Sequence, residues 1–127
     1  MENEKSALGL DANITALLGY IIGIVALVLI FIEKENKFVR FHALQSVLYS
    51  VGMVILIIVV AIVGGGLAFA LAYASPTLGS LVGILVFIVY MLLILAIIGG
   101  HLFGAYKAYN KEMFKFPVVG NFAEKWV

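Results

Sequence analysis

The sequence has no cysteine and few charged residues, and these two shortages limit what the protein can be. Without cysteine the chain has no disulfide, thiolate metal ligand or cysteine nucleophile. There is no Asp, Glu, Lys or Arg from Ala43 to Tyr106, which is about half of the chain, and Ala12–Ile32 is a second charge-free stretch. A water-soluble domain cannot leave so much of its surface without charge. The sequence therefore predicts that most of the chain lies in lipid.

Apolar residues make up 65% of the chain, and their long runs are typical of membrane spans. The run that begins near Val47 is longer than one hydrocarbon thickness, so the three glycines at 64–66 are the predicted point of change. We expect a single all-α transmembrane domain over residues 1–127, an integral membrane three-helix bundle with a short cytoplasmic interfacial C-terminal segment. The expected spans are residues 12–32, 43–66 with an extension to 74, and 79–104, and the interfacial tail is 105–127.

The basic residues predict an orientation for these three spans. Lys5 stands alone on the side of the N-terminus. The Glu33–Arg40 loop and the tail carry the other seven of the eight basic residues. Because short loops rich in Lys and Arg stay in the cytoplasm, we expect the N-terminus outside and the C-terminus inside the cell.

Small residues follow one face of the first expected span at helical spacing. A face of this kind lets a neighbouring helix approach closely in lipid. The sequence predicts a helix-packing seam, either within the chain or to a second copy. Its members are Ala12, Ala16, Gly19, Gly23 and Ala26.

Polar side chains gather near the cytoplasmic ends of the second and third expected spans. Polar groups at this depth face protein or a water-filled space rather than lipid tails. Three interpretations stay open: hydrogen bonds that fix helix packing, a pocket for a ligand or peptide, and a metal site completed by Glu33 or Glu35. Two histidines alone are fewer than the three protein ligands of a zinc site. The candidate polar pocket consists of His42, Gln45, Ser46, Tyr49, Ser50, Tyr90 and His101.

No other pattern in the chain carries chemistry. We find no nucleophile with a base and an orienting group, and the glycines at 64–66 lack the Lys-Ser/Thr of a phosphate loop. The net charge of +1 does not indicate nucleic-acid binding. We therefore expect no enzyme activity, no cofactor, no metal and no nucleic-acid partner.

The loop after the first span predicts an interface clamp made by Glu33, Lys34 and Arg40. The charged residues Glu33, Lys34, Glu35 and Lys37 form a hydrated hinge. Arg40 can reach lipid phosphates or the last carbonyls of the preceding helix, where a cation is favoured by ~0.3–1 kcal/mol. Such contacts would hold the first and second spans together at the cytoplasmic face.

Three segments carry a family resemblance: Gly9–Tyr20, Ile32–Ser46 and Tyr106–Pro117. Together they resemble a family of small prokaryotic membrane proteins that is grouped by distant similarity with the twenty-kilodalton subunit of the chloroplast inner-envelope protein translocon. The resemblance implies a prokaryotic plasma membrane and defines no catalytic residue. We expect a structural or interaction subunit that packs with itself, as a homo-oligomer, or with a larger membrane complex. The alternative is a channel or protein-translocation component similar to the translocon subunit.

Overall fold

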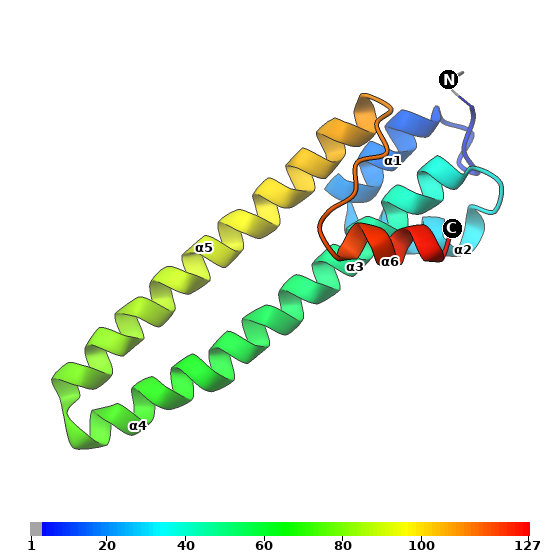
Figure 1. Cartoon of the computed structure of the whole chain (residues 1–127). Helices are drawn as coiled ribbons and strands as arrows, with labels where there is room; N and C mark the ends of the chain where they lie inside the picture. Colours follow the sequence, from blue (N-terminus) through cyan, green and yellow to red (C-terminus); the bar gives the residue numbers. More distant parts are fainter. Residues whose placement is uncertain (1–3) are drawn as a thin grey trace. The chain divides into compact units, whose positions relative to one another are not determined.

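The protein is all-α in the computed structural model, which describes residues 4–127 (Figure 1). The chain divides into two compact units, and each is described by itself. Unit 1 comprises residues 1–50 and 99–127, and unit 2 comprises residues 51–98. In chain order the elements are α1 (Ala12–Ile21), α2 (Gly23–Ile32), α3 (Lys37–Val60), the π-helical η1 (Ala61–Gly65), α4 (Gly66–Ala74), α5 (Pro76–Tyr109) and α6 (Val119–Lys125).

Among the described residues, two helices are long and apolar enough to cross a membrane. The first joins α3, η1 and α4 into one run of 38 residues, and the second is α5 with 34 residues. Both exceed the ~20 residues that a span requires. The change predicted at residues 64–66 takes the form of the π-helical η1, and the helix continues through it to Ala74. Both helices extend beyond the expected limits of the second and third spans.

The expected first span, residues 12–32, is wrong as a single helix. The backbone at Ile22 is extended, with φ −120° and ψ 97°, and it separates α1 from α2. A side chain at Gly19 would lie 3.8 Å from the Leu29 side chain, although the two residues are ten positions apart. A straight helix would separate them by ~15 Å. Helices α1 and α2 therefore fold back on each other, and the expected three-helix bundle becomes two candidate spans plus this hairpin.

The break at Ile22 is stabilised by hydrogen bonds to the freed backbone groups. The Ile22 N–H donates to the Leu18 carbonyl at 2.8 Å, and the Ser46 hydroxyl of α3 donates to the Gly19 carbonyl at 2.9 Å. A buried carbonyl without such a partner costs ~1–3 kcal/mol. The β-branched Ile21 and Ile22, followed by Gly23, also have low helix propensity. Local sequence and a tertiary contact thus favour the same reversal.

The open ends of the hairpin meet within unit 1. The Glu33 carboxylate accepts from the Ala7 N–H at 2.7 Å, so the segment before α1 lies against the loop after α2. The Asn13 side chain donates to the Tyr109 carbonyl at 3.0 Å, which brings the end of α5 to the same place. The expected separation of the N-terminal segment from the Glu33 loop by a bilayer thickness therefore does not occur.

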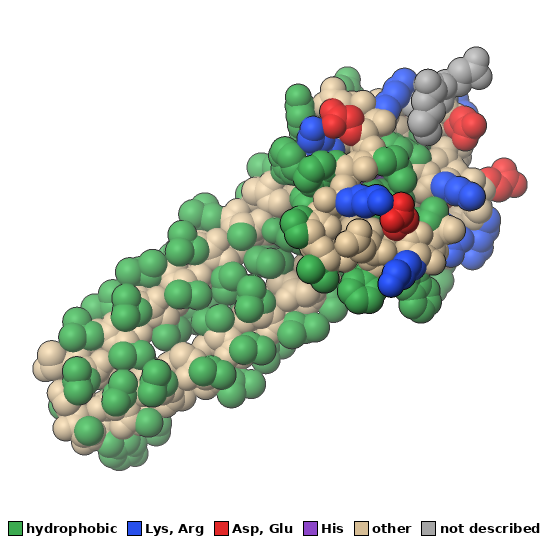
Figure 2. Space-filling view, in the orientation of Figure 1, with side chains coloured by type: hydrophobic (Ala, Val, Ile, Leu, Met, Phe, Trp, Pro, Cys, Tyr) green, Lys and Arg blue, Asp and Glu red, His purple; other side chains and the backbone are tan. Residues whose placement is uncertain are grey.

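Unit 2 is a helical hairpin without a charged residue. Its turn is at Ser75, where the backbone is extended, and the Ser75 carbonyl accepts from the Gly79 N–H at 3.0 Å. Hydrophobic side chains cover its surface, whereas the Lys, Arg, Asp and Glu side chains lie over unit 1 (Figure 2). Such a surface suits lipid rather than water.

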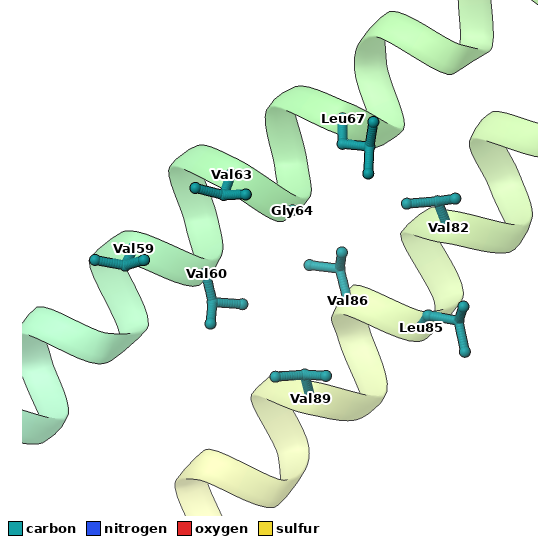
Figure 3. Close-up of a pocket in the computed structure, with 9 residues that line it drawn as sticks. All are labelled: Val59, Val60, Val63, Gly64, Leu67, Val82, Leu85, Val86 and Val89. Carbon is teal, nitrogen blue, oxygen red and sulfur yellow. The ribbon is translucent and has the colours of Figure 1, made fainter.

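An apolar groove of about 330 Å³ lies between the two helices of unit 2 (Figure 3). At Gly64 the helices are close, because a side chain there would lie 2.8 Å from the Val86 side chain. The groove has no polar side chain, so it offers no group for catalysis or polar recognition. Its lining residues are Val59, Val60, Val63, Gly64, Leu67, Val82, Leu85, Val86 and Val89.

Candidate functional site: a buried polar network

A buried amide forms the centre of the polar network in unit 1. Gln45, on α3, is completely buried. Its nitrogen donates to the Tyr20 hydroxyl at 2.8 Å and to the Phe114 carbonyl at 3.0 Å. Its oxygen accepts from the Phe116 N–H at 2.9 Å. Both donors and the acceptor of this side chain are used, so the amide pairs with the tail as a neighbouring strand would.

His42 extends the network by one turn of α3. Its Nε2 lies 3.0 Å from the Glu112 carbonyl, and its Nδ1 lies 3.1 Å from the Tyr20 hydroxyl. Because a carbonyl oxygen only accepts, Nε2 carries the proton. In the neutral ring Nδ1 then accepts from Tyr20, whose oxygen is free to accept from Gln45. Every group of this chain of hydrogen bonds is satisfied, as a buried network requires.

Aromatic rings surround the network. Phe38 and Phe41 contact His42 edge-on, with ring centres 4.6 and 5.2 Å away. On the tail, the Phe116 ring lies 5.1 Å from that of Tyr49. Edge and offset contacts of this kind contribute ~0.5–1.5 kcal/mol each beyond the burial of area. The tail is therefore held to α3 by both hydrogen bonds and ring packing.

The residues of the predicted polar pocket divide into three groups. His42, Gln45 and Ser46 are buried and bonded to other parts of unit 1. One helical turn further, the Ser50 hydroxyl lies 2.9 Å from His101 Nε2, and the Tyr49 ring lies 5.2 Å from that of His101. Tyr90 belongs to unit 2. Residues 112–116 thus occupy the part of the polar face of α3 around His42 and Gln45.

The metal site that was one of the three interpretations of these polar residues has no counterpart in residues 4–127. Within them, no three His, Cys, Asp or Glu side chains lie close enough together to hold a metal ion. Glu33, one of the two acids considered, instead accepts from the Ala7 and Asn36 N–H groups at 2.7 and 3.1 Å. Both carboxylate oxygens of Glu33 are therefore used in holding the backbone.

The predicted small-residue seam closes the α1–α2 hairpin. Ala12, Ala16, Gly19 and Ala26 are buried, and a side chain at Gly19 would lie 3.7 Å from the Ala26 side chain. Gly23 is exposed, because the break at Ile22 moves it off the face. Four of the five residues thus pack inside unit 1.

Of the three residues of the predicted interface clamp, Glu33 makes the connecting contacts. Glu33 is buried and joins the segment before α1 to the α2–α3 loop, whereas Lys34 is exposed. Arg40 is half-buried, and its Nε has no hydrogen-bond partner in the described chain. Together with Lys5 and Lys34, Glu33 lines a polar hollow of about 350 Å³.

Most of the sequence matches a known family. The matching model is described as the magnetosome magnetite crystal formation protein family, and it covers residues 4–123. The chain belongs to this family. No solved structure matches the chain.

Relatives of this family member are named as membrane proteins. A UPF0132 membrane protein of Methanocaldococcus jannaschii is 37% identical over 96% of this chain and 94% of its own length. A second from the same organism is 34% identical over 94% of this chain and 73% of its own length. One from Archaeoglobus fulgidus is 33% identical over 91% of this chain and 94% of its own length. These matches confirm the predicted family of small membrane proteins, while similarity to the chloroplast translocon subunit does not follow from them.

Sequence reasoning missed two parts of the network. The first is Tyr20, at the end of the Gly9–Tyr20 segment, whose hydroxyl bonds His42 and Gln45. Helical periodicity alone gave no indication of these hydrogen bonds. The tail was expected to rest on the membrane, whereas Phe114 and Phe116 offer their backbone to Gln45. A signal was present: a buried Gln needs three partners, and the polar residues of one helix face cannot supply them to each other.

Proposed function

We propose that this protein is a non-catalytic structural or interaction subunit of a membrane, which packs with itself or with a larger membrane complex. The supporting observation is that the polar groups of the candidate site are used inside unit 1. Gln45 and His42 each have their partners within the chain. What remains for a partner is the apolar surface of unit 2 and the charged surface of unit 1.

The same network argues against the alternative of a channel or translocation path. A conducting path needs a hydrated lining, and the polar residues of the spans that could supply it are Gln45, Tyr49, Ser50 and Tyr90. Gln45 is completely buried, and Ser50 is bonded to His101. Unit 2 offers no charged group to replace them.

The description of the family refers to magnetite crystal formation, and this role need not include binding of the mineral by this chain. Hard metal ions are held by clustered carboxylates and other oxygen ligands. Within the described residues 4–127, no cluster of three such side chains occurs. We therefore propose a role in the membrane itself rather than direct metal binding.

Mass and leakage measurements on the reconstituted protein test this role. We expect the purified protein in mild detergent to have a mass well above the 13.7 kDa of one chain, or to co-purify with a larger complex. Vesicles that contain it should retain a trapped ion as well as protein-free vesicles do. A solitary 13.7 kDa species without partners, or rapid ion leakage, would contradict the proposal.

We further propose that both termini lie on the cytoplasmic side, in place of the N-terminus outside that the sequence predicted. With α1 and α2 folded back, the helices Lys37–Ala74 and Pro76–Tyr109 are the two candidate crossings of the bilayer within residues 4–127. All eight basic residues then lie on one side, and the turn at Ser75 has no charge. Positively charged segments stay in the cytoplasm.

Single-cysteine labelling checks this topology, because the chain has no cysteine of its own. Lys5→Cys, Lys34→Cys and Lys111→Cys should resist a membrane-impermeant thiol reagent in intact cells and react in inverted vesicles. Thr77→Cys, beside the turn, is the matched control and should behave in the opposite way. Labelling of Lys5→Cys from outside would show that residues 12–32 cross the membrane.

A further inference from the structure

We infer that the α1–α2 hairpin is a wedge in one leaflet, which makes the protein accumulate where the cytoplasmic surface of a membrane is convex. This inference rests on the topology proposed above. Its ligand is a lipid surface, and the binding element is the exposed apolar face of the hairpin.

The length of the hairpin confines it to one leaflet. Helices α1 and α2 have ten residues each, so each is ~15 Å long. From surface to midplane a bilayer with its headgroups measures ~20–22 Å. The open ends of the hairpin are joined by the bond from Ala7 to Glu33, and the charged Lys5 and Lys34 flank them. The hairpin thus enters and leaves through the same surface, and its tip at Ile22 stops short of the midplane.

The two faces of the hairpin differ in what they contact. Ala16, Ala26 and Leu29 have no exposed surface and pack inside unit 1. On the other face Ile24 is 64% exposed and Phe31 is 73% exposed. Removal of one such side chain from water is worth ~1.5–3 kcal/mol, so this face favours acyl chains over water. The hairpin is therefore a lipid-contacting element and not only a cover for α3.

The tail helix α6 contributes further apolar side chains to the same leaflet. In α6 the buried Gly120 and Ala123 face the protein. Phe122 of α6 is exposed, and so are Val118 and Trp126, which flank the helix. Aromatic residues beside lysine are typical of the headgroup region. Lys125 lies over the Phe122 ring, with its Nζ 5.6 Å from the ring centre.

The difference between the leaflets follows from these lengths. The helices Lys37–Ala74 and Pro76–Tyr109 have 38 and 34 residues, so each passes through both leaflets. The hairpin adds two helices, each ~10 Å wide, to the cytoplasmic leaflet alone. A leaflet with additional inserted area is relaxed when its surface is convex, as it is for interfacial helices that sense curvature.

Reconstitution into small and large vesicles of one lipid composition tests the wedge. We use the full chain labelled at Lys111→Cys, and we measure protein per lipid and the fraction with the tail outside. We expect about twofold or greater enrichment on small vesicles, with the tail on the convex outer surface. Equal density and equal orientation on both sizes would overturn the inference.

Two matched double variants distinguish the effect of the hairpin from the effect of exposed hydrophobic side chains in general. Ile24→Ala with Phe31→Ala trims the lipid face of α1–α2 and should abolish the enrichment. Phe69→Ala with Phe87→Ala removes side chains of unit 2 that are 67% and 60% exposed, and the enrichment should persist. Equal effects of the two pairs would count against the wedge. Accessibility of Thr77→Cys on the same vesicles tests the proposed topology. The mass measurement tests the proposed packing role. A failure of the wedge can therefore be told apart from a failure of either proposal.

Discussion

A Gln45→Leu variant should release the tail from α3. The substitution removes two donors and one acceptor. It leaves the Phe114 carbonyl and the Phe116 N–H without their partner, while the Tyr20 hydroxyl keeps its bond to His42. Each unsatisfied buried group costs ~1–3 kcal/mol. Because the two backbone groups regain water when the tail opens, we expect local opening rather than global unfolding.

Hydrogen exchange of the Phe116 amide measures this opening directly. If the free energy of local opening falls by about 3 kcal/mol, the amide should exchange more than ~100-fold faster. Ser50→Ala is the matched control on the same helix, because the Ser50 hydroxyl bonds Ser46 and His101 and not the tail. Its Phe116 amide should exchange as slowly as in the natural protein.

Slow exchange in Gln45→Leu would show that ring packing alone holds the tail. The rings of Phe116 and Tyr49, 5.1 Å apart, are the contact that would then be responsible. A Phe116→Leu variant distinguishes the two causes. It keeps the backbone N–H of residue 116, so the hydrogen bond to the Gln45 side chain survives while the ring contact is lost.

The membrane class and the two long helices could be predicted from composition, because a segment within the hydrocarbon must be apolar and helical. A run without charge from Ala43 to Tyr106 has room for two helices and a turn, and little else satisfies the backbone in lipid. The glycines at 64–66 indicated an irregularity, which the structure places at Ala61–Gly65. These features depend on local sequence and on the solvent alone.

The reversal at Ile22 could not be predicted in the same way. Residues 12–32 have the length and hydropathy of a span. Taken by itself, this run is therefore equally compatible with one spanning helix and with a hairpin of two short helices. The contact that distinguishes them joins Ser46 of α3 to the Gly19 carbonyl, and it exists only in the folded chain. The same difference underlies the topology that we propose, because one span fewer would place the N-terminus on the side of the tail.

The seam shows how a correct pattern can lead to an incomplete interpretation. Small residues at helical spacing predicted close packing, and Gly19 and Ala26 do pack together. Spacing counts residues along one helix, whereas the contact here is between two antiparallel helices. Gly23, which continues the spacing, therefore falls on the exposed side.

A Gly104→Ala variant should destabilise the protein, although alanine is the better helix former. The added methyl would lie 2.5 Å from the Tyr20 ring, which is nearly fully buried. Hydrogen bonds from the Tyr20 hydroxyl to His42 and Gln45 prevent the ring from moving away. Overpacking of this kind costs ~1–3 kcal/mol, more than the ~1 kcal/mol that alanine gains in a helix. Thermal unfolding in detergent measures the balance.

Gly83→Ala is the matched control, because it changes a glycine of the same helix where an added methyl meets nothing within 4 Å. Its midpoint should stay unchanged or rise. Gly100 and Gly104 have the spacing of a helix-dimer motif, so a contact with a second copy is the competing explanation. That explanation expects Gly104→Ala to lower the oligomeric mass and leave the stability of the single chain intact. A lower midpoint at unchanged mass instead identifies Gly104 as the space that Tyr20 needs, because the ring fills it from within the same chain.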